Sequence, residues 1–354
     1  MNNRLLEQLG LLHPIIQAPM AGVATPELAA AVSQAGGLGS LGLGANTPDA
    51  ARKAIGATQA LTDRPINANC FCHARPVIDE THERYWLELL APAFAEFDAA
   101  PPGELQNLYT SFRDNDEMLA VLLEARVPVA SFHFGVPTPE QIKAMKQAGI
   151  FMLGCATSLE EARSIADAGL DAIIAQGIEA GGHRGCFDPG DDVEQLGTLE
   201  LTRQIATALA LPVIAAGGIM DGKDIRAATE AGAVAAQLGT AFVSCPESAA
   251  DDGYRSAIDA ASDKPDTTRL TAAISGRPAR CLVNRFTAWA DDHAHTMPPA
   301  YPRSYAAGKA LSAAASACGE YGFGAHWAGM NVGRSRSMPA AELMRQLVEE
   351  SARA

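Results

Sequence analysis

Residues 212–243 read PVIAAGGIMDGKDIRAATEAGAVAAQLGTAFV, and this stretch decides the fold. A short apolar run ends in Gly217 and Gly218, an alanine-rich helical pattern follows, and a second apolar run leads to Gly239 and Thr240. Apolar runs without polar alternation are typical of strands buried on both faces, as in a parallel sheet. Glycines after two neighbouring strands leave backbone N–H groups free, and in a β/α barrel the loops after the last two strands usually bind phosphate. The stretch therefore predicts the end of a phosphate-binding barrel, without choosing among FMN, a nucleotide and a sugar phosphate.

The same strand–helix unit recurs along the chain. Apolar runs predict eight strands, at residues 15–20, 38–43, 66–71, 129–134, 150–155, 172–177, 212–217 and 233–243. Alanine-rich stretches predict helices between most of them, including residues 26–34, 139–147, 158–168 and 222–231, and several are followed by the glycine of a left-handed helix cap. Eight units without a reversal signal favour an α/β fold of the (β/α)8 TIM barrel type over a doubly wound open sheet.

Two regions interrupt this rhythm. Residues 77–126 are too long for one crossover and predict an inserted helical segment within a barrel that spans residues 1–243. The remaining tail predicts a second, mostly helical C-terminal module. We expect residues 244–310 to lie on the substrate side and residues 311–354 to pack back on the barrel.

Composition narrows the class of protein. Of 354 residues, 48% are hydrophobic and 19% are charged, which indicates a soluble globular protein. A formal charge of -14 disfavours binding to nucleic acid or to an anionic membrane, and an anionic substrate would need a local cation. The N-terminus lacks a signal segment and the seven scattered cysteines suit free thiols, so we expect a cytoplasmic protein without a metal site.

Unusual residues stand at the predicted strand ends, where a β/α barrel carries its chemistry. Ala18, Pro19 and Met20 form a small turn against which a flat ring could lie, although an ordinary strand–helix turn reads the same way. Asn69 places an amide at the barrel mouth, which suits a heterocycle edge or a purely structural role. His183 follows the sixth strand in a loop with four glycines, and a titratable group so placed indicates a functional role.

Taken in order, seven short motifs resemble the nitronate monooxygenase family, formerly called 2-nitropropane dioxygenases. They are PIIQAPM (14–20), AGGLG (35–39), NAN (67–69), SFHFG (131–135), AGGHRG (180–185), AAGG (215–218) and QLGT (237–240). The SFHFG element and the tyrosine-rich tail look like the class I branch, which oxidises nitronates with O2 and lacks meaningful NADH oxidase activity. The resemblance implies a TIM-barrel enzyme with FMN and without a pyridine nucleotide site.

The resemblance also implies roles for individual residues. His183 would be the catalytic histidine, and His133 could orient the same substrate group. FMN would be contacted at the strand ends, by Ala18, Pro19, Met20, Asn69, Gln176, Gly181, Gly217, Gly218, Gln237, Leu238, Gly239 and Thr240. The substrate side would be formed by Tyr109, Tyr254, Tyr301, Tyr305 and Lys309, the last three spaced for one stripe of a helix. Lys309 could pair with a carboxylate, which would suit propionate 3-nitronate.

Some points stay open from the residues. The family often has AGQG near the C-terminus, whereas this chain reads AGMN at residues 328–331, so contacts there are in doubt. An FMN-dependent NAD(P)H:quinone or enoyl reductase on the same fold is the nearest alternative, and a non-catalytic phosphate-binding barrel is another. A monomer and a homodimer are both compatible with the sequence.

Overall fold

The computed structural model describes residues 4–190, 195–261 and 265–353, and at its centre is a barrel of eight parallel strands. The barrel order is β1-β9-β8-β6-β5-β4-β3-β2. Its strands are β1 Ile15–Gln17, β2 Gly39–Gly42, β3 Ile66–Phe71, β4 Val129–His133, β5 Phe151–Ala156, β6 Ala172–Gln176, β8 Val213–Ala216 and β9 Ala235–Leu238. A bridge between Ile16 and Leu38 joins β1 to β2, so the sheet closes and the predicted TIM barrel is confirmed.

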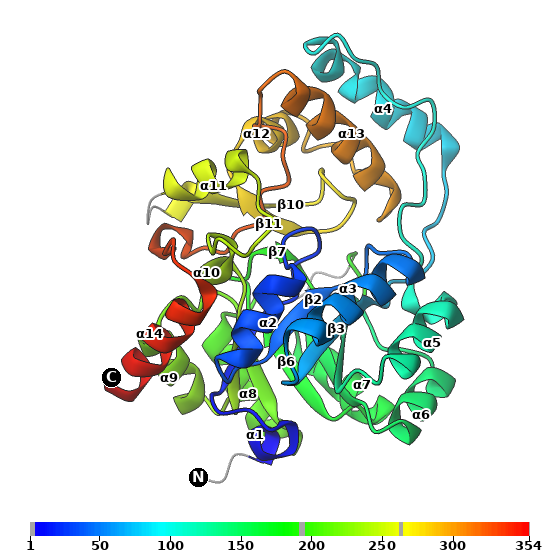
Figure 1. Ribbon diagram of the computed structural model, residues 1–354. Coiled ribbons are helices and arrows are strands. Elements are labelled where there is room, and N and C mark those ends of the chain that lie inside the picture. The colour runs from blue at the N-terminus through cyan, green and yellow to red at the C-terminus, as the bar shows by residue number, and fades with distance from the viewer. Residues whose placement is uncertain (1–3, 191–194, 262–264, 354) are drawn as a thin grey trace.

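Helices alternate with these strands and surround the barrel (Figure 1). Those of the barrel region are α1 Arg4–Leu9, α2 Pro26–Gln34, α3 Pro48–Leu61, α4 Glu80–Ala95, α5 Asp116–Glu124, α6 Pro139–Gln147, α7 Leu159–Ala168, α8 Thr198–Ala208, α9 Gly222–Glu230 and α10 Thr240–Val243. A Thr-Pro pair begins α2, α3 and α6 in the same way. In each, the threonine side chain accepts a backbone N–H of the first turn, and proline fixes the first helical dihedral angle.

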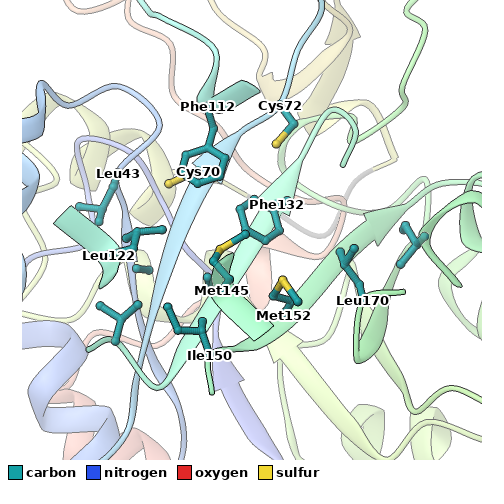
Figure 2. Close-up of a cluster of buried hydrophobic side chains, with 14 of the residues drawn as sticks. Leu43, Cys70, Cys72, Phe112, Leu122, Phe132, Met145, Ile150, Met152 and Leu170 are labelled. Atoms are coloured by element: carbon teal, nitrogen blue, oxygen red, sulfur yellow. The ribbon is translucent and has the colours of Figure 1, made fainter. Parts of the chain in front are cut away.

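Apolar side chains fill both sides of the barrel wall. Outside it, Phe132 of β4 and Met152 of β5 pack against Leu122 of α5 and Met145 of α6, as Figure 2 shows. Inside it, Ile174 and Ile214 belong to a cluster that includes Leu5 and Leu9 of α1. Since α1 seals one end with these leucines, the barrel can open only at the other end, where the parallel strands have their carboxyl ends.

The tail adds a layer above the open end and a helix beside the barrel (Figure 1). Its helices are α11 Asp252–Asp259, α12 Arg285–Asp292, α13 Arg303–Ala317 and α14 Ala340–Arg353. The tail also has short 3-10 helices at Pro265–Thr267 and Val332–Arg334, and another lies earlier in the chain at Phe112–Asp114. The helix α4 from the segment 77–126 packs against α13, whereas α14 packs on α2 and α9. Within the described ranges, no helix combines the length and the apolar character needed to cross a membrane.

One prediction from the sequence needs correction, and one finding adds to the prediction for the tail. The strand expected at residues 233–243 ends at Leu238, because the backbone at Gly239 leaves the extended region and Thr240–Val243 turns into α10. The tail expected to be mostly helical also contributes β10 Thr268–Thr271 and β11 Ala279–Leu282. These strands form an antiparallel sheet with β7 Gly182–His183, and this sheet draws the histidine loop toward the tail.

Candidate active site

A cavity of about 420 Å³ opens at the carboxyl ends of the barrel strands. Its walls come from the turn after β1, the ends of β3, β4, β6, β8 and β9, the histidine loop, α13 and the segment around residues 327–331. Because such strand ends are where β/α-barrel enzymes hold their reacting groups, this cavity is the candidate active site.

The structure brings nearly all of the predicted site residues to this cavity. The lining includes Ala18, Pro19, Met20, Asn69, Tyr109, His133, Gln176, Gly181, His183, Gly217, Gly218, Gln237, Gly239, Thr240, Tyr254, Tyr301, Tyr305 and Lys309. Leu238 is the exception because it does not line the cavity, and its contact with a cofactor stays a prediction. Side chains alternate along β9, so Leu238 points outward into the core with Leu28 and Leu343 while Gln237 faces the cavity.

Glycines form one end of the cavity with bare backbone. Gly217 and Gly218 adopt φ angles of 119° and 69°, in the left-handed region that favours glycine. A Cβ on Gly181 would lie 2.5 Å from the backbone nitrogen of Gly329, and the same nitrogen donates to Thr240 Oγ1 at 3.0 Å. Loops that are distant in sequence therefore meet as a cradle of backbone groups, the arrangement that binds phosphate in this fold.

The histidine loop is held through the carbonyl of His183. That oxygen accepts a hydrogen bond from Gln176 Nε2 at 3.0 Å and one from His133 Nε2 at 3.2 Å. Since a carbonyl can only accept, His133 carries its proton on Nε2. The Gln176 oxygen in turn accepts from the backbone N–H of Gly185 at 2.8 Å. His133 and Gln176 thus fix the backbone that carries His183.

The His183 ring lies in an aromatic pocket. Its neighbours are Phe134, Tyr301, Tyr305 and Trp327, with ring centroids 5.0 to 6.0 Å away. Burial lowers the pKa of His183 to about 3, with further contributions from His133 and Arg277. The imidazole is therefore neutral at pH 7, which fits a proton acceptor and not a cationic hydrogen-bond donor.

Three buried arginines surround the histidine loop, and none forms an ion pair with a carboxylate of the described residues. Arg184 donates to the carbonyl of Gly177 at 2.6 Å, Arg277 to that of Cys186 at 2.6 Å, and Arg280 to that of Ile178 at 3.1 Å. Burial lowers the pKa of each guanidinium. None of the three lines the cavity, so they add positive charge behind the histidine loop of a chain with a formal charge of -14.

Comparisons with known proteins show which family this chain resembles. A family model described as nitronate monooxygenase matches residues 2–350. A protein of Paraburkholderia phytofirmans named nitronate monooxygenase is 56% identical over 98% of this chain and 94% of its own length, and one of Pseudomonas aeruginosa with the same name is 50% identical over 99% of both. The solved nitroalkane oxidase from Streptomyces ansochromogenes superposes with a TM-score of 0.87, at 42% identity and covering 99% of this chain and 98% of that one.

The chain belongs to the nitronate monooxygenase family. The resemblance inferred from the seven motifs is thereby confirmed, and so is the prediction of an enzyme. Membership supports the oxidation of nitronates as the class of reaction, and the geometry shows which side chains line the cavity.

Three of the tyrosines that line the cavity form one aromatic wall. Tyr109 and Tyr301 cluster with Phe134, while Tyr305 packs at their side. The Tyr254 hydroxyl donates to the carbonyl of Trp327, and its ring stacks on His326. The expected helical stripe is only partly correct, because α13 begins at Arg303 and Tyr301 lies in the preceding turn.

Lys309 lies at the exposed rim of this wall. Its ammonium group is 5.4 Å from the ring centroid of Tyr109 and 5.2 Å from that of Tyr305. No ion pair ties it to a carboxylate within the described part of the chain. The charge is therefore held over two aromatic faces and is available to a ligand.

Several lining residues were not singled out from the sequence. Asn331, at the position where this chain departs from the AGQG of the family, donates to the carbonyl of Gly218 at 2.6 Å and lines the cavity. Phe134 has φ 70°, an unusual angle outside glycine, and its ring carries the Arg277 guanidinium at 4.4 Å. The Phe-Gly pair in SFHFG was the only sequence signal for this turn. No local sequence pattern predicted that Trp327 would line the cavity or that Arg277 would contact Phe134.

Proposed function

We propose that this enzyme uses FMN and O2 to oxidise alkyl nitronates to a carbonyl compound and nitrite, with propionate 3-nitronate as the preferred substrate. The observation that carries the proposal is the presence, in one cavity, of a backbone phosphate cradle and a neutral histidine. Neither feature alone selects a nitronate oxidase.

The residues present fit a phosphate-tailed flavin. Gln237 Oε1 is buried at the cavity without a partner among the described residues, and a ligand N–H would satisfy it. Asn69 donates to Ser131 through its amide nitrogen, at 3.0 Å to Oγ, which leaves its oxygen for a heterocycle edge. A Cβ on Gly239 would enter space bounded by Ala18 and Met20, where a flat ring has room beside the turn after β1.

Within this arrangement, Gly218, Gly181 and Thr240 would hold the phosphate, and Asn69 and Gln237 the ring system. When bound, FMN would supply the electron-transfer chemistry between the nitronate and O2. The protein orients the substrate and supplies charge. Arg277 and Arg184 lie behind the cavity wall, so they would favour a negative nitro group only through their electrostatic potential. Neutral His183 could take a proton from a nitroalkane that arrives unionised.

Lys309 supports the choice of a carboxylated nitronate. Its ammonium lies at the rim of the aromatic wall, so a substrate with its nitro group near His183 could extend a carboxylate toward it. A simple alkyl nitronate would leave this charge unused.

The test begins with the visible spectrum of the purified protein and a phosphate analysis of any released flavin. Oxygen consumption is then followed with propionate 3-nitronate, ethylnitronate and NADH. We expect a flavin spectrum, released FMN, and turnover of both nitronates but not of NADH. Rapid flavin bleaching by NADH without oxygen would favour the reductase alternative, and a protein that stays colourless after reconstitution with FMN would favour a non-catalytic binder.

A further inference from the structure

Ser275 contacts His183 from outside the cavity. It is fully buried in the turn between β10 and β11, and its Oγ lies 2.9 Å from His183 Nε2. The contact follows from topology, because β11 pairs with β7 and opposes Ala279 to His183. Gly276 in this turn adopts φ 88°, and a Cβ at this position would lie only 2.4 Å from the carbonyl oxygen of Pro299. The turn therefore packs closely against residue 299. The backbone of the β10–β11 turn therefore fixes the position of the Ser275 hydroxyl.

A hydrogen-bond count around Ser275 fixes the direction of this contact. Its single hydroxyl proton has two possible acceptors, His183 Nε2 and the carbonyl of Arg277 at 3.2 Å. That carbonyl has no other donor among the described residues, whereas Nε2 can carry its own proton. If Ser275 donates to Arg277 and accepts from His183, every group is satisfied, including the Arg277 N–H at 3.3 Å.

The other ring nitrogen of His183, Nδ1, is then the one available to a ligand in the cavity. His183 Nδ1 makes no hydrogen bond with the described residues, and it is not among their buried polar atoms without a partner, so it is accessible. The ring lines the cavity, while the backbone behind it is held by Gln176 and His133.

We propose that Ser275 is a positioning residue that holds His183 as the Nε2–H tautomer and presents an unprotonated Nδ1 to the substrate. The proposal rests on the proposed function for its kinetic consequence. With a neutral nitroalkane, the Cα–H bond breaks, its proton moves to Nδ1, and its electron pair forms the C=N bond while the nitro oxygens take the charge. A nitronate supplied as the anion needs no such transfer and should depend far less on Ser275.

The tautomer itself can be observed without turnover. Nitrogen NMR of the holoenzyme labelled with ¹⁵N-histidine distinguishes protonated from bare ring nitrogens, and the His183→Gln variant assigns the signals of residue 183. We expect Nε2–H in the wild type and a mixed or reversed tautomer in Ser275→Ala. Nδ1–H in the wild type would overturn the proposal, even if the enzyme oxidises nitronates as proposed.

Kinetics supply the second measurement. In Ser275→Ala, kcat/KM for nitroethane should fall by about tenfold to a hundredfold, part of the roughly 10²–10⁴-fold that a positioned base contributes, while that for ethylnitronate changes by less than about threefold. Ser275→Thr, which keeps the hydroxyl, should recover most of the loss. Ser304→Ala is the matched control, since Ser304 is equally buried and its hydroxyl has no partner among the described residues.

The outcomes separate the two proposals. Equal losses with both substrates, or losses matched by Ser304→Ala, would reduce Ser275 to a structural role and overturn the inference. Absence of nitronate turnover with the Nε2–H tautomer in place would instead overturn the proposed function. If Ser275→Ala fails to fold, the wild-type tautomer still decides the matter.

Discussion

At the scale of single residues, Lys309 gives the sharpest test of substrate choice. Lys309→Met keeps most of the side-chain length and removes the charge above Tyr109 and Tyr305. KM for propionate 3-nitronate should rise about tenfold, the effect of losing one charge-assisted contact, and KM for ethylnitronate should stay within about twofold. Steady-state oxygen consumption measures both. Lys143→Met, on exposed α6, controls for the change in net charge, and equal effects on the two substrates would remove the carboxylate contact.

The low pKa of His183 makes a second prediction. Burial lowers this pKa to about 3, so a neutral proton acceptor is lost only as the pH falls toward that value. With a neutral nitroalkane, whose proton His183 would accept, kcat/KM should show no fall on the acid side between about pH 8 and pH 5. A limb with an apparent pKa near 6.5, the ordinary histidine value, would mean that the imidazole titrates unperturbed and that its burial has no catalytic consequence.

The residue scale also shows where sequence reasoning stops. Asn69, His183 and Thr240 were predictable because each follows an apolar run at a strand end. For Leu238 the motif match did not say which side of β9 its side chain faces, and the side chain lies in the core, away from the cavity. Ser275 and Arg277 could not be found, because their contacts join residues about 90 positions apart through hydrogen bonds that leave no local pattern.

At the scale of elements, the cradle depends on loops that only glycine can form. In Gly218→Ala the new Cβ would lie 2.9 Å from Glu179 Cβ and the residue would keep φ 69°. We expect FMN affinity to fall about tenfold or more, measured by flavin fluorescence during titration of the apoprotein, because alanine costs about 1 kcal/mol in that conformation before any clash. An unchanged dissociation constant would show that the Gly218 turn does not contact the cofactor.

Gly56→Ala is the control for that experiment. Gly56 lies within α3, with open space around its missing Cβ. The substitution should leave flavin binding unchanged and raise the free energy of unfolding by about 0.5–1 kcal/mol, because alanine loses less backbone entropy in a helix.

Elements differ in how well the sequence predicted them. The barrel helices and strands were recognisable because helix caps and continuous apolar runs repeat with one period. The β10–β11 sheet was missed because its strands are four residues long and carry arginines, one of which, Arg280, is buried and satisfied by the Ile178 carbonyl. A buried cation with backbone partners erases the apolar signal on which strand prediction depends.

For the whole molecule, buried histidines predict sensitivity to acid. His73 is 3% exposed, and burial, followed by Arg277, lowers its pKa to about 4. Between about pH 6.5 and pH 4 the unfolded chain binds more protons than the folded one, so stability is complete above this range and declines as the pH falls through it. For His73 the loss is of order 1–3 kcal/mol by pH 4.

Urea unfolding at a series of pH values checks this, with His73→Phe as the comparison. The variant packs an aromatic ring against Phe134 and Tyr301 but cannot titrate, so its stability should depend less steeply on pH. Identical pH dependence of the two proteins would exclude His73 as a source of the acid sensitivity, although His133, with a pKa lowered to about 4 by burial, would still contribute.

The pairing of β7 with β11 has a consequence for how such enzymes can diverge. His183 is held by two stretches of polypeptide, one that follows the sixth barrel strand and one in the tail. A chimaera that joined this barrel to the tail of another protein would keep His183 and β7, but the strand that pairs with β7 would come from the other protein. A single crossover between residues 183 and 279 takes the two strands from different parents, so we expect it to survive selection less often than a crossover outside this interval.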